Sequence, residues 1–196
     1  MIIMKKKNAA ALFCVMLAAG ALIARAQVTP SGTEHHITLT TGAVGSFFQP
    51  DYAGGGVPQA SPDRLDGMGV YVDVGLTRWV QFEAEGRWLG ANEYRNISQN
   101  NYLIGPRIPI YPLEFWKVTP YAKVLVGWAS MNFEDNFAWG RFTDIAYGGG
   151  MDIKVSKRFS VRAIDFEYQQ WPDWLNTSLH PYGYSAGIGY TIFGAH

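Results

Sequence analysis

Apolar and polar residues alternate along eight segments of this chain. Successive side chains of a β-strand point to opposite faces of the sheet, so a period of two predicts strands. The alternation is clearest near the end of the chain, where tyrosines and isoleucines alternate with glycine, serine and threonine. The predicted strands are His36–Phe48, Asp66–Leu76, Val80–Leu89, Asn100–Ile110, Val118–Ala129, Thr143–Ile153, Phe159–Tyr168 and Tyr182–Phe193.

The third segment shows what this pattern leaves open. Phe82 and Trp88 share one face of the strand, whereas Glu83, Glu85 and Arg87 share the other. In a soluble sandwich, or in a lipocalin-like barrel with an apolar interior, the charged face would meet water. In a transmembrane barrel the apolar face meets lipid and the charged face lines the lumen. The segment alone fits both arrangements.

The seventh segment interrupts the alternation. Arg162 belongs to one parity, whereas Asp165 and Glu167 belong to the other. A regular strand would therefore place one of these charged groups in lipid. A β-bulge between Arg162 and Asp165, or a strand that leaves the membrane near Asp165, would avoid this. We predict one of these two arrangements.

The connections between the segments alternate between long and short. The long ones are polar or rich in Gly, Pro and Asn and cover 48–65, 90–99, 130–142 and 169–181, and the short ones cover 77–79, 111–117 and 154–158. Outer-membrane barrels have short periplasmic turns and longer external loops. The alternation therefore favours a transmembrane barrel.

The charged residues recur on the parity that is otherwise built of Gly, Ser and Thr. An eight-stranded barrel is just wide enough to be filled by side chains, and buried charges are tolerated when they are paired. We therefore predict a structural ion-pair network in the lumen, made by Glu83, Glu85, Arg87, Arg107, Lys123, Asp152 and Arg162. Aromatic residues gather near strand ends on the opposite parity, as interfacial girdles do. The predicted girdle residues are Trp79, Trp88, Tyr102, Trp116, Trp128, Tyr182 and Tyr190.

The first 26 residues have the features of a secretory signal peptide. Lys5, Lys6 and Lys7 precede the apolar stretch 9–23, and Ala24-Arg25-Ala26 fits a cleavage site with small residues. We predict a signal peptide at 1–26, a short lead-in at 27–35 and one barrel domain at 36–196. Cys14, the single cysteine, lies within the predicted signal, so the exported protein would have no disulfide.

Charge limits the kinds of partner. The chain has 16 basic and 16 acidic residues, and removal of the predicted signal leaves 12 basic against 16 acidic. A net charge near −4 argues against a nucleic-acid partner. After residue 26, no apolar run reaches the roughly 20 residues that a membrane helix needs.

The last segment adds a signal of a different kind. Ser185, Gly187, Tyr190 and Ile192 fit the spacing polar-x-Gly-x-x-hydrophobic-x-hydrophobic, which resembles the C-terminal signal read by the bacterial barrel assembly machinery. That signal usually ends the chain at an aromatic residue, whereas here Phe193-Gly194-Ala195-His196 follows.

The eight alternating segments, and in particular the segments 101–107 and 119–123, resemble the OmpA-like eight-stranded outer-membrane β-barrel family. The resemblance covers 36–193. It implies an all-β, antiparallel up-and-down transmembrane barrel in the bacterial outer membrane. It also implies contact with lipid and lipopolysaccharide, and with the assembly machinery during biogenesis.

For function, the sequence predicts no catalytic residue, no metal ligand and no cofactor. The interpretation it favours is a structural envelope role, or display of external loops to an unknown surface ligand. The alternatives are a lipid A-modifying acyltransferase or esterase, for which His180 and nearby Ser178 are the candidate residues, and a small porin-like channel.

Overall fold

The computed structural model describes residues 37–51, 64–90, 97–110, 117–132, 139–174 and 177–194. The predicted signal peptide, the lead-in, Trp116 and the last two residues lie outside this part. No helix in the described part has the length and hydrophobicity needed to cross a membrane.

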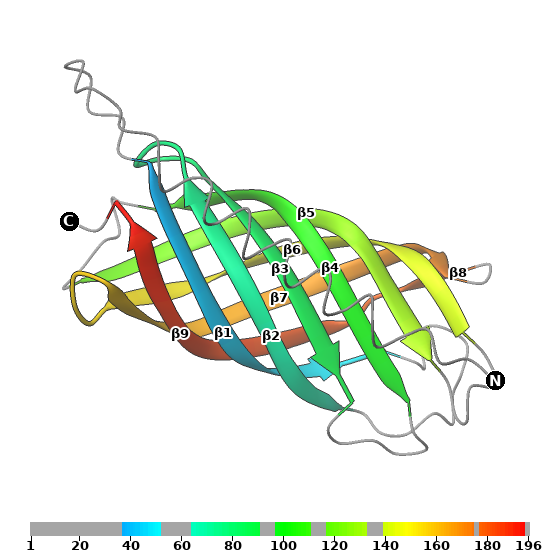
Figure 1. Ribbon diagram of the computed structural model, residues 1–196. Helices are drawn as coiled ribbons and strands as arrows, with labels where there is room; N and C mark the ends of the chain where they lie inside the picture. The colour runs from blue at the N-terminus through cyan, green and yellow to red at the C-terminus, as the bar shows by residue number, and fades with distance from the viewer. Residues whose placement is uncertain are drawn as a thin grey trace, which may run out of the picture. The chain divides into compact units, whose positions relative to one another are not determined.

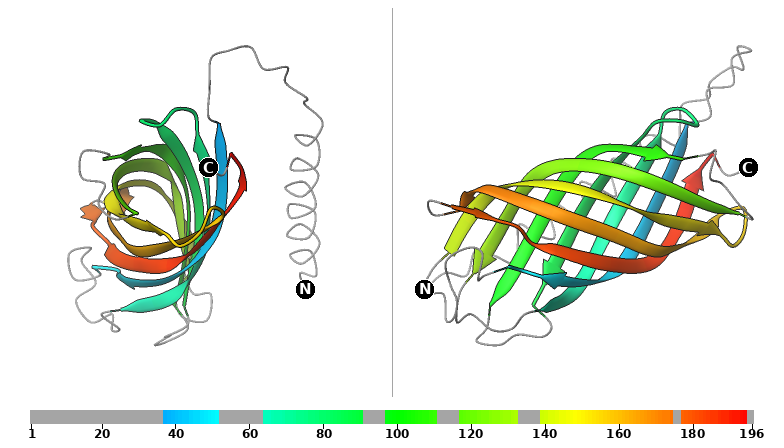
Figure 2. Two further views of the ribbon diagram at one scale, coloured as in Figure 1. Left: turned by 90° about the vertical axis from the view of Figure 1, so that its left-hand side faces the viewer. Right: turned by 180° about the vertical axis from the view of Figure 1, so that it is seen from behind.

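The fold is an antiparallel β-barrel that closes on itself (Figures 1 and 2). Its strands are β1 (Thr38–Gln49), β2 (Leu65–Gly75), β3 (Gln81–Leu89), β4 (Ser98–Pro109), β5 (Val118–Asn132), β6 (Trp139–Lys154), β7 (Phe159–Trp174), β8 (Thr177–Leu179) and β9 (Tyr182–Phe193). Each strand from β1 to β7 pairs with the next, and β7 and β1 both pair with β9. The first strand (blue) and the last (red) therefore lie side by side in Figure 1, which confirms the predicted eight-stranded barrel.

The ninth strand, β8, is a short addition that the sequence did not predict. It forms a hairpin with the end of β7, where Trp171 pairs with Leu179. The segment 169–181, expected as a loop, is thus largely strand. The predicted loop 130–142 is also wrong in extent, because β5 continues to Asn132 and β6 begins at Trp139.

Apolar packing explains these extensions. An inward-facing cluster at this end of the barrel joins residues from β4, β5, β7 and β8: Ile97 beside β4, Ala129, Met131, Trp171 and Leu179, with Phe142 packed against it. Residues from both segments, 130–142 and 169–181, contribute to this cluster. Their burial keeps the described parts of these segments in strand conformation, although the adjoining sequence is polar and rich in Asn. We call this end, with its β7–β8 hairpin, the loop end, and the end bearing the connections 76–80, 110–117 and 155–158 the turn end.

The predicted bulge in β7 is present. Met151 pairs with Ile164 and Asp152 pairs with Arg162, so Ala163 is the extra residue. The pairing of β7 with β9 shifts at the same place, between Arg162 and Asp165. Both charged residues consequently face inward, and each is only 1% exposed.

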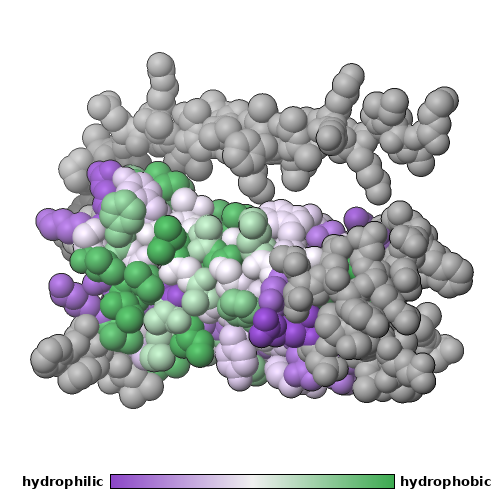
Figure 3. All heavy atoms as spheres, turned by 90° about the horizontal axis from the view of Figure 1, so that it is seen from below, coloured by the Kyte–Doolittle hydropathy of each residue, from purple (hydrophilic) through white to green (hydrophobic). Residues whose placement is uncertain are grey.

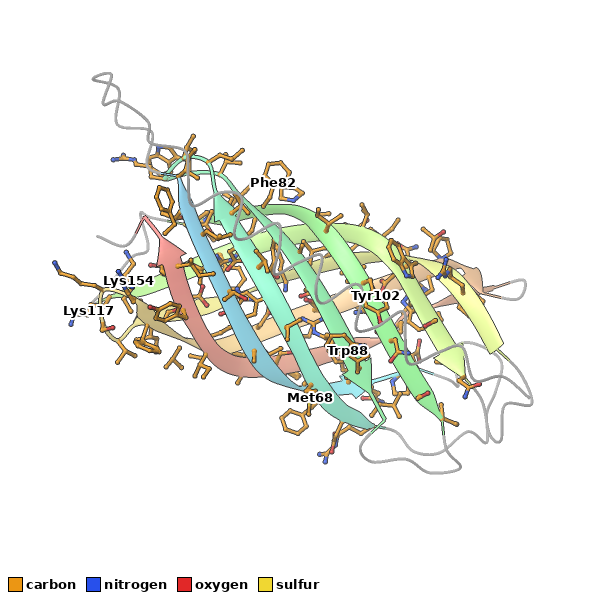
Figure 4. The ribbon with its side chains drawn as sticks, viewed as in Figure 1. Met68, Phe82, Trp88, Tyr102, Lys117 and Lys154 are labelled. Atoms are coloured by element: carbon orange, nitrogen blue, oxygen red, sulfur yellow. The ribbon has the colours of Figure 1, made fainter. Side chains whose placement is uncertain are left out.

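The outer face of the barrel is apolar. Met68, Ile104 and Ile188 are each more than half exposed, although they lie within strands. In Figure 4 the side chains of Met68, Phe82, Trp88 and Tyr102 project from the outer surface. Figure 3 shows apolar side chains over the strands on one face, with hydrophilic residues toward both ends. An apolar outer face with charged side chains inside is the arrangement of a transmembrane barrel whose outer surface contacts lipid.

Candidate functional site: the charged lumen

Lys123 on β5 lies among four inward-facing carboxylates. Its Nζ is 2.7 Å from Glu83 and 2.7 Å from Asp165. Its Nζ is also 3.2 Å from Glu85 and 2.5 Å from Glu167. The ammonium group is fully buried, so it relies on these partners to replace water.

The same four carboxylates are the one group in the described chain with the spacing of a metal site. Their nearest oxygen atoms lie within 4.8 Å of one another. The Lys123 ammonium is within ion-pair distance of all four, so it occupies the position that a bound cation would take. The positive charge that balances these carboxylates therefore comes from a side chain of the protein itself.

Arg87 on β3 lies next to Lys123 and pairs with three of these carboxylates. Its guanidinium forms a two-pronged contact with Glu167, is 2.9 Å from Glu85 and is 3.5 Å from Asp165. Phe48 stacks against it at 5.1 Å. Such a fork matches the planar geometry of carboxylates and fixes both partners.

Arg107 on β4 and Arg162 on β7 form a second group nearer the turn end. Both approach Asp73, at 3.3 Å and 3.0 Å, and both pair with Asp152. Arg162 is also 2.9 Å from Glu83, which links the two groups into one network.

Tyrosine rings fill the space beside these guanidinium groups. Arg162 lies over the ring of Tyr71 at 3.6 Å, and Arg107 lies over Tyr121 at 3.7 Å. Glycines make room for the rings: a side chain at Gly42 would meet Tyr71 at 2.3 Å, and one at Gly150 would meet Tyr121 at 2.7 Å. The glycine-rich inner parity is thus the space in which the large polar side chains pack.

All seven residues predicted for the lumen network face inward and take part in these ion pairs. The prediction omitted three carboxylates that belong to the same network: Asp73, Asp165 and Glu167. The sequence could have indicated them, since Asp73 lies on the same face of its strand as the other charged residues, and the predicted bulge turns Asp165 and Glu167 to that face. It also missed a polar layer toward the loop end, in which Asn101 donates to Asp144 at 2.6 Å and to Gln169 at 3.0 Å.

The predicted girdle residues that the structure describes lie on the outer face, in two places. Toward the loop end, Trp88 donates to the Tyr102 hydroxyl at 3.1 Å, and Tyr102 packs on Trp128 at 5.8 Å. Tyr182 is at the same end and donates to Gln49. At the turn end, Tyr190 packs on Phe159 at 5.1 Å, and Trp79 is 46% exposed.

The four residues of the predicted assembly signal alternate on β9. Ser185 faces inward and is 2.8 Å from Ser46, and Gly187 packs closely against Ala43 and Val44 of β1. Tyr190 and Ile192 lie on the outer face. Their recognition by the assembly machinery stays a prediction.

His180, the candidate residue of the enzyme alternative, stacks on Tyr168, with ring centres 5.7 Å apart. No hydrogen bond joins it to Ser178 among the residues that the structure places. The structure thus shows no hydrogen-bonded pair of nucleophile and base at these two residues.

The closed sheet, the apolar outer face and the charged lumen define a transmembrane β-barrel. A family model described as "Outer membrane protein beta-barrel domain" matches residues 11–191. The chain belongs to this family, and with it to the bacterial outer membrane. A search of curated proteins finds no match.

Three solved outer-membrane barrels share the fold. OprG from Pseudomonas aeruginosa is 10% identical, with a TM-score of 0.56 over 80% of this chain and 96% of its own. The N-terminal β-barrel domain of OprF from the same organism is 12% identical, with a TM-score of 0.53 over 79% and 97%. Neisserial surface protein A is 11% identical, with a TM-score of 0.54 over 79% and 96%. At these identities the likeness is one of fold.

Proposed function

We propose that this protein is a non-enzymatic outer-membrane barrel whose lumen is closed by its ion-pair network. Its role is then to strengthen the envelope or to present its loop end to a ligand, and bulk passage of solutes is not part of that role. One observation carries the proposal: four cations and six carboxylates from β2 to β7 meet in one connected network across the lumen.

The dimensions of the barrel support a closed lumen. Eight strands enclose a space that side chains can fill. Here Tyr71, Tyr121 and Phe48 pack beside the guanidinium groups, and Leu103, Leu125 and Ala146 form a further inward-facing apolar cluster. An ion would have to displace paired, buried charges to pass, and such displacement is costly.

Current measurements on single proteins in planar lipid bilayers test the proposal. We expect no stepwise conductance from wild-type protein whose insertion is verified by resistance to protease, while a general porin in the same bilayers gives open channels. Stable conductance steps from the wild-type protein would reject the closed lumen and favour the small-channel alternative.

The proposal extends to how the protein reaches and meets its membrane. Residues 1–26 direct export and are removed, the β9 residues Ser185, Gly187, Tyr190 and Ile192 engage the assembly machinery, and the girdles contact lipid and lipopolysaccharide. Intact mass of the protein purified from outer membranes tests the first step, with a chain that begins at Gln27 as the expected result. A chain that retains residues 1–26 would contradict it.

A further inference from the structure

A cavity of about 280 Å³ opens at the turn end of the barrel. Its walls come from the first residues of β1, the 76–80 and 155–158 turns and the last residues of β9. Its floor includes Asp73, Arg107 and Asp152, which belong to the ion-pair network of the lumen. The cavity is therefore a recess with a closed floor.

The wall of this recess is strongly basic. Arg78, Lys154, Lys157 and Arg158 line it, and none of them forms a salt bridge with a carboxylate of the described chain. The two carboxylates that line the recess are already engaged, because Arg107 and Arg162 both pair with them. The recess is consequently lined by more cations than carboxylates, and these four cations have no carboxylate partner in the described chain.

Hydroxyl groups stand between these cations. Thr38, Thr40, Thr119, Ser156, Ser160 and Thr191 all line the recess. The Thr119 hydroxyl is shielded from solvent and has no hydrogen-bond partner among the described residues. The Ser156 oxygen accepts the backbone N–H groups of Arg158 and Phe159, at 3.3 and 3.1 Å, which leaves its own hydrogen free to donate.

We propose that this recess binds a phosphate group. Phosphate carries up to two negative charges and several acceptor oxygens, so it matches a wall of unpaired cations and hydroxyl donors. The closed floor makes the recess a binding site and not a section of a conduit. Lys154 and Lys157, which have no carboxylate partner, provide the main charge that holds the ligand.

The phosphate can come from a lipid headgroup or from solution, and the position of the recess allows both. Arg158 lines the recess and also donates to the Tyr190 hydroxyl at 3.0 Å on the lipid-facing side. Phe159 lines it too and is 55% exposed on that side. The mouth thus lies beside the headgroup level of the membrane and is open to the aqueous phase at the turn end.

Backbone amide NMR of the full protein tests the proposal. One arm uses dodecyl maltoside micelles, which contain no phosphate, titrated with inorganic phosphate against chloride at equal ionic strength. The other arm titrates the same micelles with a short-chain phosphatidylglycerol. We expect saturable shifts at residues 154–159 and at Thr119 in at least one arm, and the responding arm identifies the source.

Charge-removing variants make the test specific. The double variant Lys154→Gln/Lys157→Gln should weaken binding about tenfold or more, because two direct contacts between a cation and the phosphate are lost, at distances much shorter than the Debye length. Lys117→Gln is the matched control: Lys117 lies at the same end as Lys154 (Figure 4) but does not line the recess. We expect its affinity to change less than about twofold, since surface charges act weakly through salt solution. Absence of saturable shifts in both arms, or an equal loss in Lys117→Gln, would overturn the proposal.

Discussion

At the scale of single residues, Lys123 and Arg162 each pair with four carboxylates of the lumen, and Lys123 does so with a single ammonium group. One ammonium group lies within 3.2 Å of four carboxylates that belong to strands β3 and β7. Removal of one partner from a buried pair leaves uncompensated charge, which costs more than the pair itself contributes. The stability of the barrel should therefore be sensitive to a change at this side chain.

We expect Lys123→Leu to lower the free energy of unfolding by about 3–5 kcal/mol, the range for a broken buried pair. Urea unfolding in detergent micelles, followed by tryptophan fluorescence, measures this loss. Lys117→Leu is the control, because Lys117 is exposed at the turn end and forms no ion pair within the described chain. Equal unfolding midpoints for wild type and Lys123→Leu would contradict the role of the network.

Two glycines of β1 lie on opposite faces of the strand, Gly42 on the inner face and Gly45 on the outer. A side chain at Gly42 would meet the Tyr71 ring at 2.3 Å and the Ile188 carbonyl oxygen at 2.4 Å, whereas one at Gly45 would meet nothing within 4 Å. We expect Gly42→Val to cost about 1–3 kcal/mol through overpacking. Gly45→Val, which adds an apolar group to the lipid face, should leave the same unfolding curve nearly unchanged. A reversed order of the two variants would show that the faces are assigned wrongly.

At the scale of elements, β7 shows what the sequence could predict and what it could not. The conflict in parity between Arg162 and Asp165 required a bulge or a strand end, and the bulge is what the chain uses. The hairpin beyond it was missed because Pro172 and Asn176 resemble loop residues. What decides the local structure there is the burial of Trp171 and Leu179 against residues distant in sequence, which no local pattern reports.

Deletion of Ala163 tests whether this residue is the extra one. Without it Arg162 directly precedes Ile164, the pairs Asp152–Arg162 and Met151–Ile164 follow one another as in a regular strand, and Asp165 and Glu167 still face the lumen. We therefore expect the variant to keep the heat-modifiable folded band on gel electrophoresis. Deletion of Phe166, in the regular part of the same strand, is the control: it would turn Glu167 toward lipid and should abolish that band, because charges at mid-membrane are strongly unfavourable. Loss of the band on deletion of Ala163 would show that the bulge is assigned wrongly.

Substitution of Trp171 tests the packing of the β7–β8 hairpin. Its ring is fully buried and stacks on Phe142, with centres 5.9 Å apart. We expect Trp171→Ala to reduce the free energy of unfolding by about 3–5 kcal/mol, as for other buried aromatic residues. Trp128→Ala removes an indole that is 45% exposed on the outer face and should cost clearly less. Calorimetry of both variants in micelles makes the comparison, and equal losses would argue against a packed loop end.

At the scale of the whole molecule, the barrel reverses the usual arrangement of apolar and charged residues. The segment 80–89 could not choose between lipid and core, because alternation gives two faces without saying what each one meets. The choice came from features spread along the chain: the common parity of the charges, the alternation of connections and the pattern of the last strand. The partners across the lumen, such as Lys123 with Glu167, depend on closure and register and were not predictable from the pattern.

The methyl groups of Val124, Leu125 and Val126 test this account most directly, because neighbouring residues of β5 face lipid, lumen and lipid in turn. In methyl-labelled wild-type protein in nanodiscs, we expect a lipid-soluble nitroxide to broaden Val124 and Val126. A water-soluble gadolinium chelate should broaden none of the three, since Leu125 is fully buried and the proposed closed lumen excludes the chelate. Broadening of Leu125 by the chelate would reveal an open, water-filled lumen, and failure of the nitroxide to reach Val124 and Val126 would refute the lipid-facing surface.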